Sequence, residues 1–206
     1  MSRARIAVLV SGGGTNLEAL LSAQEAGKIP HGEITVVLSS RPGAYALERA
    51  ANHGVPGFAV PRKGRTQEEF EAGLTEKLTE YRADMIILAG FLSILSEDFV
   101  KRWPGRILNV HPSLIPAFCG KGFYGLKVHE EVLRRGVKLT GATVHYVNEI
   151  PDGGEILLQK AVEVLPGDTP ELLQRRVMEQ AEWVLLPQAA ELTAQRLTQS
   201  EKGYAL

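Results

Sequence analysis

Short apolar runs that alternate with helical stretches constrain the fold of this chain more than any other feature. The clearest run, Met85-Ile-Ile-Leu-Ala89, is apolar at every position and too short for a buried helix. A parallel strand covered on both faces needs this all-apolar character. Strands are expected at residues 5–10, 34–38, 58–60, 85–89 and 107–111, with helices at 16–26, 44–52 and 66–81. Thr66 is expected to cap the last of these helices. The alternation predicts an α/β fold with a doubly wound, mostly parallel sheet.

The pattern changes in the second half of the chain. Two further strands, 139–147 and 155–164, are separated only by the loop 148–154, which favours an antiparallel, hairpin-like extension over another helical crossover. A helix is expected to begin at His129, and two helical stretches follow at Pro170 to Val184 and Pro187 to Thr198. The polar tail from Gln195 to Leu206 is consistent with a solvated helix end. We expect one domain over residues 1–206.

Composition and charge argue against several classes of protein. The 23 basic and 24 acidic residues give a formal net charge of -1, which disfavours nucleic acid or an anionic membrane surface as the main partner. The longest apolar stretch, Met85 to Leu92, is much shorter than the roughly 20 residues that cross a bilayer. A single cysteine, Cys119, allows no intramolecular disulfide, and no Cys/His cluster has metal-ligand spacing. We therefore expect a soluble, cytoplasmic protein without a metal.

A glycine-rich segment, Ser11-Gly-Gly-Gly-Thr-Asn16, lies between the first expected strand and the first expected helix. Free backbone N–H groups and the positive end of a helix dipole can bind a phosphate at such a place. The dinucleotide fingerprint would need glycine where Leu17 stands, and the lysine of a nucleotide-binding P-loop is absent. A phosphate monoester is the better candidate ligand. The alternative is a turn that merely packs the strand against the helix.

Asn109 and His111 end the strand 107–111, where α/β folds place reactive side chains. Residues i and i+2 of a strand point to the same face, so the amide and the imidazole can reach one substrate atom. His129 and His145 are read as structural or supporting residues. Asp152, in Pro-Asp-Gly-Gly, would be read as a turn residue if it stood alone.

Taken together, these motifs resemble the phosphoribosylglycinamide formyltransferases, a folate-dependent family, over nearly the whole chain. The resemblance is carried by Ile6 to Leu17, Leu88-Ala-Gly-Phe91, Leu108-Asn-Val-His-Pro-Ser-Leu-Ile-Pro116, Thr140-Gly-Ala-Thr-Val-His145, Asp152-Gly-Gly154 and Gly167-Asp-Thr169. It implies a Rossmann-like fold with a phosphate-binding half at about residues 1–104 and a catalytic, folate-binding half at about 105–206. The Asn-x-His-Pro-Ser-Leu core is shared with formyltetrahydrofolate hydrolases, whereas the glycine segment and the length favour the purine enzymes.

The resemblance also implies a binding role for particular residues. Gly14, Thr15 and Asn16 would bind the phosphoribosyl end of glycinamide ribonucleotide. An acidic residue near the C-terminus would recognise the substrate amine. Counting back from Pro187 favours Glu182 over Glu179 for this role. This alignment leaves Trp183 where the family has histidine. The folate site would comprise Gln67, Leu92, Ser93, Ile94, Leu95, Asn109, Asn148, Glu149, Ile150, Pro151 and Asp152. Ser93 and Gln67 stand where the family has arginine, and Arg62 and Arg65 are close enough to Gln67 in sequence to substitute for it.

The resemblance implies formyl transfer from 10-formyltetrahydrofolate to the amine of glycinamide ribonucleotide. Asn109 and protonated His111 would stabilise the tetrahedral intermediate, and Asp152 would keep His111 cationic and assist proton transfer. No metal is implied, and the chain would be a monomer or homodimer. Two alternatives stay open: a hydrolase that uses water as the acceptor, and a noncatalytic phosphosugar-binding protein. In a binding protein of this kind, no catalytic role would exist for Asn109, His111 and Asp152.

Overall fold

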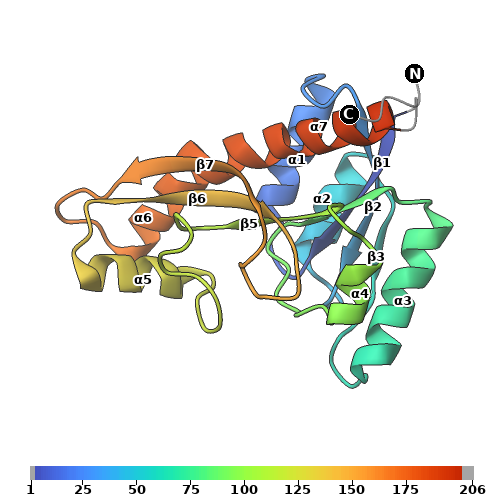
Figure 1. Ribbon diagram of the computed structural model, residues 1–206, viewed down its shortest axis with the longest axis horizontal. Helices are drawn as coiled ribbons and strands as arrows, with labels where there is room; N and C mark the ends of the chain where they lie inside the picture. Colours follow the sequence, from blue (N-terminus) through green and yellow to red (C-terminus); the bar gives the residue numbers. More distant parts are fainter. Residues whose placement is uncertain (1–2, 201–206) are drawn as a thin grey trace.

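Seven strands form a single sheet in the computed structural model, which describes residues 3–200 (Figure 1). Their spatial order is β3-β2-β1-β4-β5-β6-β7. The parallel strands are β1 (Ala4–Val10), β2 (Gly32–Ser39), β3 (Gly57–Ala59), β4 (Met85–Leu88) and β5 (Ile107–His111). At one end of the sheet, β6 (Leu139–Tyr146) and β7 (Ile156–Glu163) are antiparallel. The doubly wound sheet with an antiparallel extension is confirmed.

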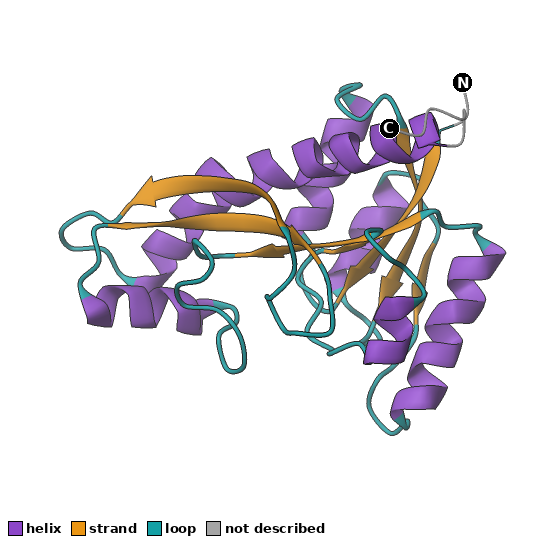
Figure 2. Cartoon of the chain, in the orientation of Figure 1, coloured by secondary structure: helices purple, strands orange, loops and turns teal. Residues whose placement is uncertain are grey.

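Helices cover both faces of the sheet (Figure 2). On one face, α1 (Thr15–Glu25), α2 (Tyr45–Asn52) and α7 (Trp183–Ser200) enclose a core that includes Ile6 and Val8 of β1. On the other face, α3 (Gln67–Glu80) and α4 (Glu97–Lys101) enclose a core that includes Ala7 and Leu9. Successive residues of β1 are therefore buried on opposite faces, which explains why the strand is apolar throughout.

Most element boundaries agree with the sequence-based expectations to within two residues. Thr66 caps α3 as expected: its hydroxyl accepts from the N–H of Glu69, and the Glu69 carboxylate accepts from the N–H of Thr66. The sequence analysis missed α4. Its signals were present, because Ser96 caps the helix and Glu97 and Asp98 occupy its first turn.

The expected helix starting at His129 begins earlier. In the structure α5 spans Leu126–Arg135, so that His129 is the fourth residue of the helix. Gly125, with φ 54°, turns the chain directly before it. His129 is buried on the inner face of α5 together with Val128 and Val132.

The expected break at Pro187 is wrong. The chain passes from α6 (Pro170–Val177) through a π-helical turn (Met178–Glu182) directly into α7, and Pro187 lies inside α7. A proline crowds the carbonyl of the residue four positions earlier, here Trp183, and a π-type turn ends directly before that residue. Leu185 and Leu186 are buried against the sheet, and this packing favours a continuous helix.

The first part of the expected C-terminal tail is helical. Residues 195–200 complete α7, and residues 201–206 lie outside the described part of the chain. Between residues 3 and 200, no helix is long and apolar enough to span a membrane.

Candidate active site

The carboxyl ends of β1, β4 and β5 meet at one edge of the sheet, and the candidate site lies along that edge. The strand order changes direction between β1 and β4, which is the point where open α/β sheets place their ligands. The two loops that follow these strands are joined by a hydrogen bond of 2.9 Å from the N–H of Leu92 to the hydroxyl of Ser11. Residues after β1 and residues after β4 therefore form one continuous surface.

Asn109, His111 and Asp152 come together, although 41 residues separate His111 from Asp152. Asn109 and His111 lie on β5, and the loop between β6 and β7 folds back over them. Asp152 Oδ2 is 3.5 Å from His111 Nδ1, and Asp152 Oδ1 is 3.5 Å from Asn109 Nδ2. A side chain at Gly154 would meet the carbonyl oxygen of Tyr146 at 1.7 Å, so glycine is required where this loop closes.

The loop that follows β5 contacts both His111 and Asp152. His111 Nε2 is 2.8 Å from the carbonyl oxygen of Phe118, and the N–H of Gly120 donates to Asp152 Oδ2 at 2.8 Å. A carbonyl oxygen can only accept, so the contact with Phe118 places a proton on Nε2. Nδ1, the other ring nitrogen of His111, faces the Asp152 carboxylate. No sequence pattern signals the contacts of Phe118 and Gly120, because both are made by the backbone.

His145 lies behind Asn109 and Asp152. Its Nδ1 is 3.0 Å from the carbonyl oxygen of Tyr146, so Nδ1 carries a proton. Its Nε2 is 3.1 Å from Asn109 Nδ2 and 3.6 Å from Asp152 Oδ1. The 3.5 Å contact between Asn109 and Asp152 is long for a hydrogen bond, so an amide hydrogen of Asn109 is available to a ligand.

The surroundings of Asp152 stabilise its charged form. Burial alone raises the pKa of this carboxyl group, but His145, the charge of His111 and the N–H of Gly120 together outweigh burial. The pKa of Asp152 is consequently below its usual value. His111 therefore faces an ionised carboxylate.

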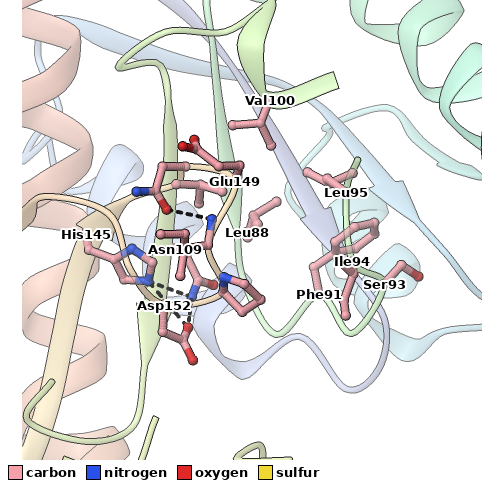
Figure 3. Close-up of a pocket in the computed structure, with 14 residues that line it drawn as sticks. Leu88, Phe91, Ser93, Ile94, Leu95, Val100, Asn109, His145, Glu149 and Asp152 are labelled. Carbon is pink, nitrogen blue, oxygen red and sulfur yellow. Dashed lines mark hydrogen bonds and ion pairs between the residues drawn. The ribbon is translucent and has the colours of Figure 1, made fainter. Parts of the chain in front are cut away.

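An open pocket lies beside these residues (Figure 3). The loop 148–152 forms one wall and the segment that contains Phe91 and Ile94 forms the opposite wall. Of the residues expected to bind folate, the pocket is lined by Ser93, Ile94, Leu95, Asn109, Asn148, Glu149, Ile150, Pro151 and Asp152. Five further residues line the pocket and were not expected from the sequence: Leu88, Phe91, Val100, His145 and Val147. Val100 belongs to α4, the missed helix.

Two of the expected folate residues lie outside this pocket lining. Leu92 is half-exposed at the beginning of the segment. Gln67 lies behind the segment, where its amide donates to the carbonyl oxygen of Ile94 at 3.0 Å and faces a separate groove. Arg62 donates to Gln67 Oε1 at 3.2 Å and to the carbonyl oxygen of Arg65 at 2.5 Å. Of the two arginines considered, Arg62 therefore contacts the side chain of Gln67.

The glycine segment and the C-terminal acidic residue also come together. Gly14, with φ 74°, precedes α1, and no side chain caps the free N–H groups of the first turn. Asn16 Nδ2 donates to Glu182 Oε2 at 2.7 Å. Burial raises the pKa of Glu182, and the hydrogen bond from Asn16 opposes this effect. Glu179 instead pairs with Arg175 at the surface, so Glu182 is the acidic residue at the glycine segment.

Trp183 follows Glu182 and begins α7. Its indole nitrogen is buried and has no hydrogen-bond partner among residues 3–200. Thr15 contacts the sulfur of Met178 in the π-helical turn at 3.8 Å. The π-helical turn is therefore the element that places Met178 and Glu182 against the start of α1.

Known proteins are similar to this chain in sequence and in fold. Residues 4–189 match the formyl transferase family. The trifunctional purine biosynthetic protein adenosine-3 of Bos taurus is 42% identical over 93% of this chain, which spans only 18% of that relative. The chloroplastic phosphoribosylglycinamide formyltransferase of Arabidopsis thaliana is 35% identical over 99% of this chain and 70% of its own length.

Solved structures give the same result for the fold. Glycinamide ribonucleotide transformylase 1 from Symbiobacterium toebii superposes with a TM-score of 0.87 at 42% identity, covering 94% of this chain and 88% of that one. A formyltetrahydrofolate deformylase from Burkholderia mallei superposes with a TM-score of 0.83 at 29% identity, covering 95% of this chain and 66% of that one. The family match includes the whole sheet, both loops and the three clustered side chains, and the chain therefore belongs to the formyl transferase family.

Proposed function

We propose that this protein transfers the formyl group of 10-formyltetrahydrofolate to the amine of glycinamide ribonucleotide, a step of purine biosynthesis. The observation that carries the proposal is the cluster of Asn109, His111 and Asp152 at the base of an open pocket. Two relatives named for this activity, from Arabidopsis thaliana and Symbiobacterium toebii, are 35% and 42% identical to the chain, and the deformylase structure is 29% identical.

In the proposed reaction, the neutral amine attacks the formyl carbon and a negative charge develops on the former carbonyl oxygen. The free amide hydrogen of Asn109 donates to this oxygen, and protonated His111 provides a second, charged donor. Loss of one such donor typically lowers kcat by about 10²- to 10³-fold. Asp152 maintains the charge of His111 and receives the proton that the attacking amine loses. The bond between the formyl carbon and N10 of the folate then breaks, His111 gives its proton to N10, and tetrahydrofolate leaves. Transfer of the proton from Asp152 to His111 restores the starting state. Each step is assigned to a side chain or to one of the two substrates.

The two binding regions divide the substrates between them. The pocket beside Asn109 takes the pterin ring of the folate, between Ile94 and the loop 148–152. The N–H groups of Gly14, Thr15 and Asn16 bind the phosphate of the ribonucleotide, while Glu182 meets its amine. This assigns phosphate binding to about residues 1–104 and catalysis and folate binding to about residues 105–206. Glu182 is the exception, because it reaches the N-terminal half from the C-terminal one.

The arrangement at the glycine segment favours a transferase over a hydrolase that uses water as the acceptor. A hydrolase needs the three catalytic side chains and the folate pocket, but it needs no phosphate site and no buried carboxylate bound to Asn16. We propose the cytoplasm as the place of action and a monomer or homodimer as the active form.

The decisive experiment measures the release of tetrahydrofolate from 10-formyltetrahydrofolate, with and without glycinamide ribonucleotide. Release that requires the ribonucleotide supports the transferase, and His111→Asn should then abolish most of it. Release at the same rate without the ribonucleotide would make the protein a hydrolase. An inactive but folded protein that still binds the ribonucleotide would leave only the binding function.

A further inference from the structure

The glycine segment is attached to α2 through two of its carbonyl groups. The carbonyl oxygen of Gly12 accepts from the N–H of Ala46 at 3.1 Å. The carbonyl oxygen of Gly13 accepts from Nε of Arg49 at 2.9 Å. Gly14 lies directly against the same helix, because a side chain there would meet Cβ of Ala46 at 2.6 Å. The segment therefore rests on α2, with two of its carbonyls turned toward that helix.

This attachment determines where the N–H groups of the segment point. In a trans peptide the carbonyl of one residue and the N–H of the next point in opposite directions. The carbonyls of Gly12 and Gly13 face α2, so the N–H groups of Gly13 and Gly14 face away from it. The proposed phosphate lies on that side, at the start of α1. The backbone N–H of Ala46 holds the Gly12–Gly13 peptide by a hydrogen bond. The Gly13–Gly14 peptide is held by the side chain of Arg49.

Arg49 is itself held in place by its neighbours. Its NH1 donates to Glu18 Oε2 at 2.8 Å, and its guanidinium lies 5.0 Å from the centre of the Tyr45 ring. Glu18 also contacts Nε2 of His53 at 3.0 Å, and His53 Nδ1 contacts Glu25 at 2.6 Å. The hydrogen bonds from Arg49 and His53 lower the pKa of Glu18, so its carboxylate stays charged and keeps its bond to Arg49.

We propose that Arg49 is a positioning residue for the phosphate site: it orients the Gly13–Gly14 peptide so that the N–H of Gly14 points at the phosphate, without contacting the phosphate itself. The inference rests on the proposed function for the identity of the phosphate ester, but it can be tested with inorganic phosphate alone. It assigns a role in substrate affinity to a residue outside the catalytic cluster and outside the glycine segment.

The first test replaces Arg49 with Met and with Lys. In Arg49→Met the Kd for inorganic phosphate and the KM for glycinamide ribonucleotide should rise about tenfold, as expected for the loss of one hydrogen bond from a charged group. The kcat and the KM for the folate should stay within about twofold. Arg49→Lys keeps a charged donor and should recover part of the affinity. Arg134→Met, which removes a surface arginine paired with Glu131 on α5, is the matched control and should change none of these constants.

Two further measurements separate positioning from simpler effects. The residual dipolar coupling of the Gly14 N–H in ligand-free protein reports the direction of that bond, and it should change in Arg49→Met but not in Arg134→Met. An unchanged coupling with a weaker phosphate affinity would overturn the proposal, because Arg49 would then contact phosphate directly. The double variant Arg49→Met, Glu18→Gln removes both charges of the pair, and its affinity for inorganic phosphate should stay as low as that of Arg49→Met. Recovery of the affinity in the double variant would overturn the proposal, because only the local charge would then matter.

These outcomes do not depend on transferase activity. If the protein binds phosphate in an Arg49-dependent way but does not transfer formyl groups, the proposed function fails and the positioning role stands. If transfer occurs and phosphate affinity is the same in Arg49→Met, the positioning role fails and the proposed function stands.

Discussion

Asp152 shows how one side chain acquires a role from its contacts. Its carboxylate faces His111 and Asn109 at 3.5 Å and accepts from the N–H of Gly120 at 2.8 Å. The residue has φ 56°, a conformation that is uncommon for a residue other than glycine. The geometry of the loop therefore directs this carboxylate toward the two residues on β5.

Replacing Asp152 with Asn should lower kcat by about 10²- to 10⁴-fold, because the neutral amide cannot support protonated His111 or take up a proton. Asn has nearly the same shape, so the KM for the folate should change little. Steady-state kinetics would measure both constants. The matched control is Asp168→Asn. Like Asp152, Asp168 accepts a hydrogen bond from a backbone N–H, but it lies away from the site and pairs with Arg176. Full activity in Asp152→Asn would contradict the role proposed for this residue.

His129 is a buried ionisable group that the proposed mechanism does not use. Its side chain is 0% exposed, and neither ring nitrogen has a partner in the described part of the chain. Burial, with a smaller contribution from the charge of His111, lowers its pKa from 6.5 to about 4. The folded protein therefore keeps His129 neutral at a pH where the unfolded chain protonates it.

This difference predicts a loss of stability in acid. Between pH 6.5 and pH 4 the unfolded state binds a proton at His129 and the folded state does not, so unfolding becomes easier as the pH falls. Between pH 7.5 and pH 5.0 this residue should account for about 2 kcal/mol of the decrease in unfolding free energy. Urea titrations of wild type and His129→Leu at both pH values would show it as a smaller difference in the variant. Equal differences in the two proteins would refute the assignment.

At the scale of elements, α3 illustrates a helix whose start is determined by local sequence. Thr66 and Glu69 exchange hydrogen bonds across the first turn, and two acidic residues in that turn complement the helix dipole. These signals are contiguous in sequence, which is why the expected start was correct.

Removing this cap should cost a predictable amount of stability. Thr66→Ala leaves the N–H of Glu69 without its acceptor and should lower the unfolding free energy by about 1 kcal/mol. Thr79→Ala, near the other end of α3, provides a control and should change it by less than about 0.5 kcal/mol. Urea unfolding followed by circular dichroism would measure both. A Thr66→Ala protein as stable as wild type would mean that the cap contributes little in this context.

The C-terminal helices illustrate the opposite case. Local sequence suggested a new helix at Pro187, because proline is favoured at the first position of a helix and disfavoured inside one. The structure instead continues the helix through Pro187 after a π-helical turn. Burial of Leu185, Leu186 and their neighbours against the sheet is a tertiary contribution that exceeds the local preference.

At the scale of the whole molecule, the sheet brings two binding regions to one edge. The glycine segment follows β1, the pocket wall follows β4, and the catalytic side chains follow β5, three strands that are adjacent in the sheet. The phosphate and folate regions are made by different residues. Ligands at the two regions should therefore stabilise the fold independently.

This independence can be measured by thermal unfolding. Inorganic phosphate and a folate analogue, each at about 100 times its Kd, should each add about 2.7 kcal/mol to the unfolding free energy. Together their effects should be nearly additive. Gly14→Ala places a methyl group against Ala46 and requires φ 74°, so it should abolish the effect of phosphate and retain that of the folate analogue. Loss of both effects in this variant would contradict two separate regions.

The sequence predicted the elements whose signals are local: the apolar runs of β1 and β4, the cap at Thr66, and the hairpin between β6 and β7. The sequence also predicted Asn109 and His111 as a pair, because residues two positions apart on a strand lie on the same face. Asp152 looked like an ordinary turn residue, and only its motif context suggested a catalytic role.

The contacts that join distant segments depend on how the folded chain packs. The folded loop closes at Gly154 and brings Asp152 to His111, the π-helical turn brings Glu182 to Asn16, and the backbone of Phe118 and Gly120 holds the catalytic pair. Such contacts have no periodicity or spacing along the chain, because they depend on how the loops at one edge of the sheet pack against one another. For the same reason, the link from Arg49 to Gly13 becomes visible only in the folded protein.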